Sequence, residues 1–265
     1  AVMAIFPLLA GWCFKRWQPA APWRQALFFA ALVAAVDWLR SWIFTGFPWL
    51  VVGYSQAPPS PLAGFAPVLG VHGLSLLVAL AGALLLRWRV GVGFLALAVL
   101  TGLALRQVVW TTPVGEPIRV ALIQGNIPQE MKFRPEAFLR TLDLYRQLVE
   151  DNPAQLTLLP ETAVPAFFDQ LPPDYADSLK SAAQKHGGDL VFGTITGQGE
   201  HYWNSAVSLG NSPAQSYSKT HLVPFGEFIP PGFSWFLRLA SIPMSSFSRG
   251  PEMQAPLAVA GQHVA

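Results

Sequence analysis

Three ionisable residues have sequence contexts that could support catalysis. Glu161 ends a short apolar strand, Lys219 ends a later strand, and Glu227 lies in the largely apolar segment 222–231, where an unpaired charge would be costly. Glu161 also has an ordinary explanation as a carboxylate at a helix N-terminus, and Lys219 as a solvated surface lysine. If the three meet, however, their titrations would be coupled and shifted, as in functional sites. We expect them to converge in one cleft around a reacting carbon.

Signatures of several other kinds of chemistry are absent from the sequence. There is no dinucleotide or phosphate-loop glycine pattern and no G-x-S-x-G elbow, and the five histidines lack metal-ligand spacing. The sequence therefore predicts neither a metal nor another cofactor. The formal net charge of +2 is too small to indicate a nucleic-acid partner. The single cysteine, Cys13, lies in an apolar run, cannot form an internal disulfide and is expected to have no chemistry.

The elements that would position the three residues predict an α/β domain over residues 118–265. Apolar positions at helical spacing indicate a helix over 135–151, and a second helix over 175–186 is closed by two glycines. Expected strands occupy 118–124, 156–159, 190–194, 205–209 and 215–219, the first of them buried. Because strands and helices interleave, the sequence predicts a layered α/β fold.

Residues 1–110 predict a helical membrane region, joined to the α/β domain by a linker at 111–117. Charged residues make up 12% of the chain and hydrophobic residues 52%, and this charged share is about half the usual one. Four apolar runs, at 1–14, 25–36, 65–86 and 90–105, are expected to be about four membrane spans, the first truncated. We expect Trp88 and residues 108–110 to extend the last run. Buried core helices of a soluble protein are the alternative reading.

The basic residues predict an orientation for these spans. Lysine and arginine gather at 15–24 and 87–89, between the first and second and between the third and fourth runs. The positive-inside rule makes these loops cytoplasmic and the α/β domain extracytoplasmic. The aromatic stretch 38–54 is expected either to face lipid above the membrane or simply to anchor the chain. Asp37 and Arg40, three residues apart, are expected to pair, and His72 to be a packed polar residue.

Several motifs resemble those of known families. An apolar strand followed by Pro160-Glu161, the run K-T-H-L-V-P-F-G-E at 219–227 and Asn-Ser-Ala at 204–206 resemble the nitrilase, or carbon–nitrogen hydrolase, superfamily. The runs F-T-G-F-P-W at 44–49, Q-G-N-I-P-Q at 124–129 and M-S-S-F-S-R-G at 244–250 resemble the apolipoprotein N-acyltransferases of Gram-negative bacteria. The resemblance covers nearly the whole chain.

This resemblance implies a fold, a location and an activity. The implied fold is a polytopic α-helical membrane region followed by a nitrilase-like αββα sandwich on the periplasmic side of the bacterial inner membrane. A Glu-Lys-Cys triad would take an acyl chain from a phospholipid as a thioester and pass it to the α-amine of a diacylated N-terminal cysteine on a lipoprotein. Glu161 matches the general base, Lys219 the lysine that stabilises the oxyanion, and Glu227 a second glutamate that orients the site.

The nucleophile implied by the family does not occur within the chain. The resemblance places it in a C-Y-E-type motif shortly after a strand like 261–265, and Cys13, in an apolar run of the membrane half, cannot replace it. Because both ends of the sequence also look cut, we expect an internal fragment of a longer protein that is inactive alone. Phe133 stands where the family often has tryptophan, and we expect it to form an aromatic wall against an acyl chain.

The arm 230–247 is expected to be a lid at the bilayer surface that guides an acyl chain to the site. It contains Phe233, Trp235 and Met244, which are candidate acyl-chain contacts. A helix packed on the domain's own core is the alternative.

Three other functions compete with the acyltransferase. One is a non-catalytic lipid- or lipoprotein-binding module with a degenerate nitrilase fold. The second is an amide hydrolase on a membrane anchor, against which the apolar aromatic segments argue. The third is a transporter, against which the scarcity of charges in the apolar runs argues.

Overall fold

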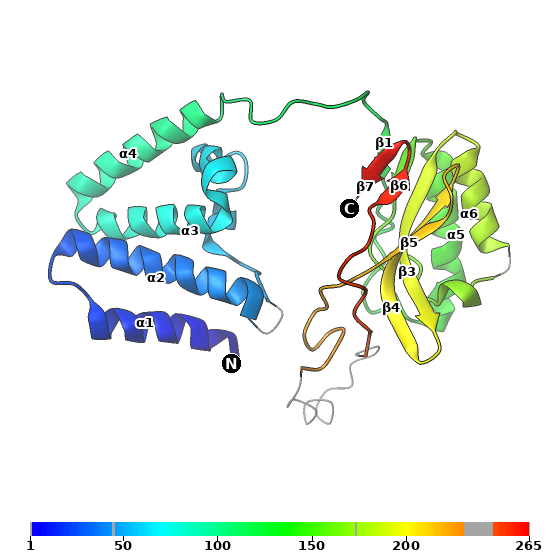
Figure 1. Ribbon diagram of the computed structural model, residues 1–265, viewed down its shortest axis with the longest axis horizontal. Helices are drawn as coiled ribbons and strands as arrows, with labels where there is room; N and C mark the ends of the chain where they lie inside the picture. Colours follow the sequence, from blue (N-terminus) through cyan, green and yellow to red (C-terminus); the bar gives the residue numbers. More distant parts are fainter. Residues whose placement is uncertain (1, 44–45, 173, 231–245, 265) are drawn as a thin grey trace. The chain divides into compact units, whose positions relative to one another are not determined.

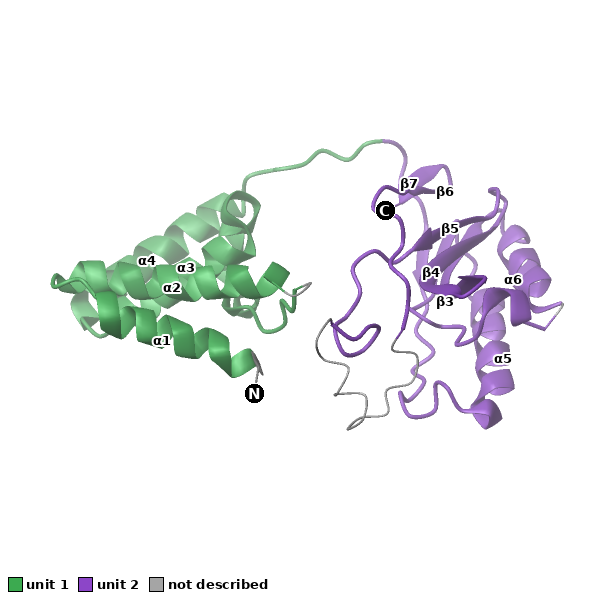
Figure 2. Cartoon of the chain, turned by 60° about the horizontal axis from the view of Figure 1, so that its bottom comes forward, with its two compact units in different colours: residues 1–114 green, residues 115–265 purple. Residues whose placement is uncertain are grey.

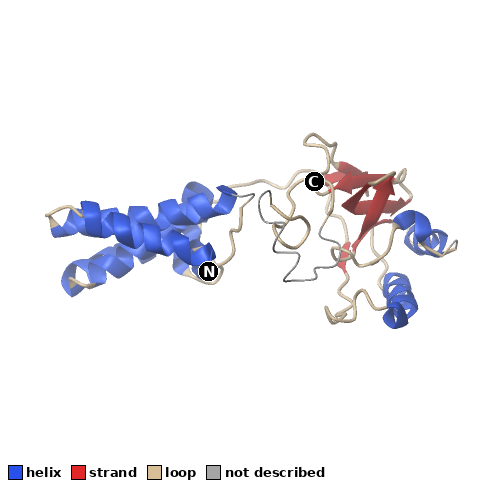
Figure 3. Cartoon of the chain, turned by 90° about the horizontal axis from the view of Figure 1, so that it is seen from below, coloured by secondary structure: helices blue, strands red, loops and turns tan. Residues whose placement is uncertain are grey.

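The chain folds as two compact units, Ala1–Val114 and Gly115–Ala265 (Figure 2). The computed structural model describes residues 2–43, 46–172, 174–230 and 246–264. The first unit is helical and the second is a mixed α/β unit (Figure 3), in the order that the sequence predicts.

The described residues of unit 1 form four α-helices (Figure 1). They are α1 Ile5–Trp17, α2 Pro22–Trp42, α3 Ala66–Leu85 and α4 Trp88–Leu105, with short 3-10 helices at Val2–Ala4, Val52–Gln56 and Pro61–Phe65. The helices fall where the four apolar runs predict them. Trp88 begins α4 as expected, but α4 ends at Leu105, so residues 108–110 do not extend it. The β-branched pair Val108-Val109 and the threonines after Trp110 disfavour a further helical turn.

Length and hydropathy separate these helices. Pro61–Leu85, with mean hydropathy 2.2, and Trp88–Leu105, with 1.8, are long and apolar enough to cross a membrane. Among the described helices, α1 and α2 do not have the combined length and hydropathy of a membrane span. That all four helices of unit 1 cross a membrane stays a prediction from the sequence.

A buried carboxylate ties α2 to α3 and to the 3-10 segment Val52–Gln56. Asp37 pairs with Arg40 at 3.1 Å, which confirms the predicted pairing. Its Oδ2 also accepts hydrogen bonds from the Val52 N–H at 2.9 Å and the Ser75 hydroxyl at 2.8 Å. The Gly53 N–H donates to Ser75 Oγ at 2.9 Å. Asp37 therefore has the partners that a buried charge needs.

The larger sheet of unit 2 has, among the described residues, five strands in the order β1-β2-β3-β4-β5. The strands are β1 Val120–Leu122, β2 Leu156–Leu158, β3 Asp189–Gln198, β4 His201–Gly210 and β5 Gln215–Ser218. The first three run parallel, and β3, β4 and β5 pair antiparallel. Each coincides with a predicted strand, but β3 and β4 are longer than predicted because they continue as one hairpin out to Gln198 and His201.

The two faces of this sheet have different covers (Figure 1). Helices α5 Pro135–Asp151 and α6 Tyr175–Gln184 bury Tyr145 and Leu179 against Leu190 and Phe192 on one face. On the other face the hairpin β6 Leu257–Val259 and β7 Gln262–Val264 buries Leu257 and Val259 in a second cluster with Leu156. Unit 2 is therefore a mixed sheet with helices on one face. The full αββα sandwich remains an expectation.

The first strand corrects one prediction. The segment 118–124 is not a buried strand: β1 covers only Val120–Leu122, and Leu122 is 78% exposed. Ala121 and Ile123 pack with the helix-side core, whereas Val120 and Leu122 alternate to the opposite face. Because β1 is the edge strand, the β6–β7 hairpin does not reach Leu122.

Candidate active site

Glu161 lies in the turn that follows β2, held closely over β3. A Cβ atom added at Gly193 on β3 would lie 2.3 Å from the Thr162 nitrogen and 2.7 Å from the Pro160 oxygen, so only glycine allows this approach. Thr162, directly after Glu161, has a φ of 50°. The short apolar strand β2 and the glycine opposite it thus place Glu161 at the carboxyl end of the parallel strands.

Lys219 follows β5 and continues its pairing with β4 by one residue, because its N–H donates to the Asn204 carbonyl at 2.8 Å. Glu227 lies in a tight turn in which its own N–H donates to the Val223 carbonyl at 2.9 Å. Phe225, inside that turn, has a φ of 62°. Left-handed backbone at residues such as Thr162 and Phe225 is costly and is often found at functional sites.

The three predicted residues converge. Lys219 Nζ lies 3.0 Å from Glu161 Oε1 and 3.0 Å from Glu227 Oε1. This confirms the predicted convergence, whereas the catalytic roles remain predictions. The glutamates differ in environment, since the side chain of Glu161 is 61% exposed and that of Glu227 only 13%.

Asn204 is a member of the cluster to which the sequence analysis assigned no role. Its Nδ2 donates to Glu161 Oε1 at 2.6 Å and to Glu227 Oε1 at 2.8 Å. The residue is buried in the middle of β4. A polar amide inside an expected strand, within a motif that had already been noted, is the signal that could have identified it.

The hydrogen bonds leave one acceptor and one donor of the cluster open. Glu227 Oε2 accepts from the Val223 N–H at 2.8 Å, so both its oxygens are engaged. Glu161 Oε2 accepts no hydrogen bond from the described residues. An ammonium has three N–H donors, and Lys219 uses two of them on the glutamates. Among the described residues, a carboxylate oxygen and an N–H donor without a partner therefore lie side by side, where a substrate could meet both.

The titrations of Glu161 and Lys219 shift in opposite directions. Burial raises the pKa of Glu161, but the hydrogen bond and charge of Lys219, the Asn204 amide and the charge of Lys132 together bring it below its ordinary value. Burial lowers the pKa of Lys219, but its hydrogen bonds and charge interactions with the two glutamates raise it above its ordinary value. At neutral pH these shifts favour an ionised Glu161 and a protonated Lys219.

A second lysine, which the sequence analysis also missed, reaches the Glu161 turn. Lys132 Nζ donates to the Glu161 main-chain carbonyl at 3.0 Å. Lys132 and Glu161 line a cavity of about 130 Å³, together with Gln124, Gln129 and Tyr145. Lys219 and Glu227 do not line it. The predicted single cleft is therefore not reproduced by this cavity.

Of the predicted acyl-chain contacts, Phe133 is the one that lies among the described residues. Phe133 is 47% exposed and does not line the cavity beside Glu161, so its role as an aromatic wall stays a prediction. Phe233, Trp235 and Met244 lie outside the described residues. The described residues contain no group of three side chains that could hold a metal ion.

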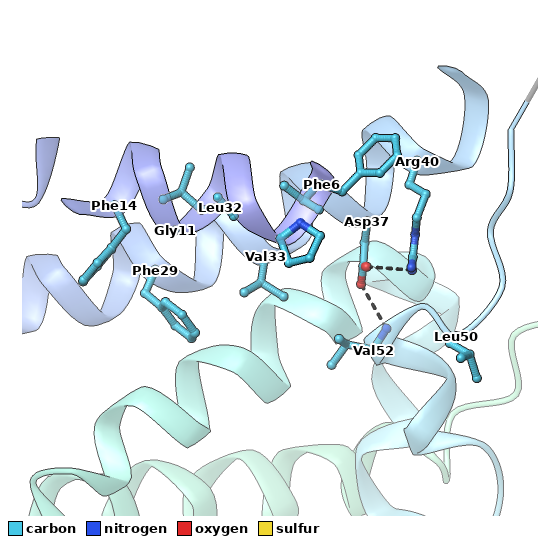
Figure 4. Close-up of a pocket in the computed structure, with 13 residues that line it drawn as sticks. Phe6, Gly11, Phe14, Phe29, Leu32, Val33, Asp37, Arg40, Leu50 and Val52 are labelled. Atoms are coloured by element: carbon cyan, nitrogen blue, oxygen red, sulfur yellow. Dashed lines mark hydrogen bonds and ion pairs between the residues drawn. The ribbon is translucent and has the colours of Figure 1, made fainter. Parts of the chain in front are cut away.

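A larger cavity, of about 420 Å³, lies within unit 1 (Figure 4). Its walls come from α1, α2 and the Leu50–Val52 segment, with apolar side chains such as Phe14 and Phe29 and the Asp37–Arg40 pair among them (Figure 4). None of the predicted catalytic residues lines it. It therefore adds nothing to the charge cluster of unit 2.

Comparison with known proteins identifies both units. Residues 1–84 match the apolipoprotein N-acyltransferase N-terminal domain, and residues 119–239 match the carbon-nitrogen hydrolase domain. The chain belongs to the apolipoprotein N-acyltransferase family. Glu161, Lys219 and Glu227 all lie within the carbon-nitrogen hydrolase match.

Two curated relatives illustrate the extent of the similarity. The chain is 48% identical to the apolipoprotein N-acyltransferase of Nitrosomonas europaea, with all of this chain and 55% of the relative covered. It is 44% identical to that of Chromobacterium violaceum, with all of this chain and 54% of the relative covered. The chain thus spans about half the length of the curated relatives it matches.

Proposed function

We propose that the full-length protein is a membrane-bound N-acyltransferase. It moves a fatty acyl chain from a phospholipid to the α-amine of the N-terminal diacylglyceryl-cysteine of a lipoprotein, through a thioester. The observation that carries the proposal is the pair of Glu161 Oε2 and the third Lys219 N–H, neither of which has a hydrogen-bond partner among the described residues, beside a Glu227 whose two oxygens both accept hydrogen bonds. Family membership supports the acyl-transfer chemistry.

The open pair suits the two halves of acyl transfer. In the first half, Glu161 Oε2 takes the proton of a cysteine thiol as the sulfur bonds to the ester carbon. The oxyanion that forms accepts a hydrogen bond from the third Lys219 N–H. Collapse breaks the C–O bond, and Glu161 returns the proton to the departing alcohol. In the second, the acceptor amine attacks the thioester carbon, Glu161 takes its proton, and the departing thiolate receives it. The cysteine of this step is the nucleophile that the family resemblance implies.

The location belongs to the same proposal. We infer that all four helices of unit 1 cross the bacterial inner membrane and that unit 2 lies on the periplasmic side. The apolarity of α3 and α4 and the basic residues at 15–24 and 87–89 support this. The acyl donor and the lipoprotein acceptor are both membrane-bound, which suits an enzyme held at the bilayer.

The proposal is tested with the full-length protein in micelles containing a phospholipid with a labelled acyl chain. Thioester formation and N-acylation of a diacylated lipopeptide are measured separately. We expect Glu161→Gln and Lys219→Met to slow thioester formation by roughly 100-fold or more, because each removes a group that acts on the reacting atoms. Lys180→Met, on the exposed surface of α6, is the matched control.

Two results would contradict the proposal. If the wild-type protein binds phospholipid but forms neither the thioester nor the N-acylated product, the protein is a non-catalytic binding module. Release of free fatty acid or ammonia from simple amides, with no transfer to the lipopeptide, is the amide hydrolase.

A further inference from the structure

Lys132 connects the segment between β1 and α5 to the turn that carries Glu161. The segment is folded locally by consecutive turns, in which the Met131 N–H donates to the Pro128 carbonyl at 2.9 Å and the Arg134 N–H to the Met131 carbonyl at 3.1 Å. From these turns the Lys132 side chain reaches across 29 residues of sequence to the Glu161 carbonyl. It therefore holds the backbone of the residue that the proposed mechanism uses as its base.

Lys132 also contributes a positive charge to the cluster around Glu161. Lys219 reaches Glu161 from the end of β5, and the same ammonium binds Glu227 from the 223–227 turn. Asn204 from β4 is neutral, and Tyr145 from α5 lines the same cavity as Glu161. Without Lys132 the cluster has two carboxylates and one ammonium. With Lys132 the cluster has two carboxylates and two ammonium groups, so its formal charges cancel.

We infer that Lys132 is a positioning residue for Glu161, which holds its main chain and places a second positive charge near its carboxylate. The inference rests on the proposed role of Glu161 as a base. Burial lowers the pKa of Lys132 and the charge of Glu161 partly offsets this, as expected for a cation that is coupled to the glutamate. Removing the cation should raise the proton affinity of Glu161.

The experiment compares Lys132→Met with Lys132→Arg in the full-length protein. Infrared difference spectra of the carboxylate band are recorded across pH, with Glu161→Gln as the blank for this one side chain. We expect Lys132→Met to raise the apparent pKa of Glu161 by about half a unit to one unit, reduced by solvent screening of this exposed group. Lys132→Arg should keep the wild-type titration, and Lys180→Met should change nothing.

Each outcome has a fixed reading. An unchanged Glu161 titration in folded Lys132→Met overturns the inference, as does an equal shift in Lys132→Arg, because charge would then not be the cause. If Lys132→Met does not fold, the same titration is measured with Lys132→Gln. This variant removes the charge but keeps a hydrogen-bond donor. The infrared measurement needs no substrate. If the wild-type protein has no transferase activity, the proposed function is refuted, but the Lys132 inference is still tested by the Glu161 titration.

Discussion

At the residue scale, the two glutamates of the cluster differ in burial and in hydrogen bonding. Glu227 is nearly buried and accepts hydrogen bonds from Lys219, Asn204 and the Val223 N–H. Glu161 is open to solvent and keeps one oxygen free among the described residues. In the proposed mechanism, Glu227 therefore holds the lysine in place and Glu161 acts on the substrate.

The Asn204 amide should be necessary for this division. Asn204→Ala removes both amide hydrogen bonds to the carboxylates, and each such bond to a charged group contributes about 1.5–3 kcal/mol. We expect acyl-enzyme formation by the full-length protein to slow by roughly 10- to 100-fold. Rates of thioester formation measure the effect.

Asn204→Asp is the sharper version of this test, because it keeps the shape of the side chain but adds a third carboxylate. It should be at least as damaging as Asn204→Ala, since like charges at this distance repel. An aspartate variant that is faster than the alanine variant would show that side-chain shape, rather than hydrogen-bond donation, is what the site needs.

At the scale of elements, side chains attach the β6–β7 hairpin to the sheet. Asp189, at the start of β3, accepts hydrogen bonds from the Ser212 N–H at 2.8 Å, the Ser212 hydroxyl at 2.6 Å and the Ala260 N–H at 2.7 Å. The Gln215 amide donates to the Ala258 carbonyl at 2.9 Å and accepts from its N–H at 3.0 Å, as a neighbouring strand would. The hairpin is thus fixed to β3 and β5 by groups that are far away in the sequence.

Asp189→Ala should loosen this attachment. Asp189 is 2% exposed, so the substitution leaves buried donors without their acceptor, and we expect a loss of about 2–4 kcal/mol in the free energy of unfolding. Burial raises the pKa of Asp189, but the Ser212 and Ala260 hydrogen bonds bring it below its ordinary value. The carboxylate therefore stabilises the fold at neutral pH, and this stabilisation is lost as pH falls below about 4.

Denaturant unfolding of the full-length protein at pH 7 and at pH 3 measures both effects. Ser212→Ala, which removes only one of the three donors, is the control and should cost less. An Asp189→Ala variant as stable as the wild type at pH 7 would show that the hairpin is held by its apolar contacts alone.

The arm 230–247 carries the remaining prediction for an element, and most of it lies outside the described residues. Phe233→Ala and Trp235→Ala together should slow acyl-enzyme formation from phospholipid while the protein stays folded, because each ring in the interface contributes about 1.5–3 kcal/mol. Unchanged thioester formation in the folded double variant would assign the arm to the core.

At the scale of the whole molecule, each unit has its own core, so the orientation of the chain in a membrane can be tested without reference to how the units are arranged. We expect a reporter fused after Leu122 to be active outside the cytoplasm and one fused within 15–24 or 87–89 to be active inside. Activity only in the cytoplasm after Leu122 would refute the proposed orientation. A fusion after residue 56 is the internal control, because it should match the outside result.

The sequence by itself determined the order of the elements and much of their extent. Helix α5 begins and ends at the predicted residues, because its apolar positions recur with the helical period and Pro135 can occupy only the first turn. The local motifs at 160–161 and 219–227 were sufficient to select Glu161, Lys219 and Glu227. Such features depend on residues that are neighbours along the chain, and these neighbours can be read directly from the sequence.

Only the tertiary structure decided which groups share the site and which faces are covered. Asn204 and Lys132 reach Glu161 across 43 and 29 residues, and no local pattern encodes the strand pairing that aligns Asn204 or the packing that brings the 128–134 turns to Glu161. Leu122 is as apolar as a core residue, yet it is exposed because β1 lies at the sheet edge. Distances and coverage depend on which strands pair, and pairing is a property of the folded chain as a whole.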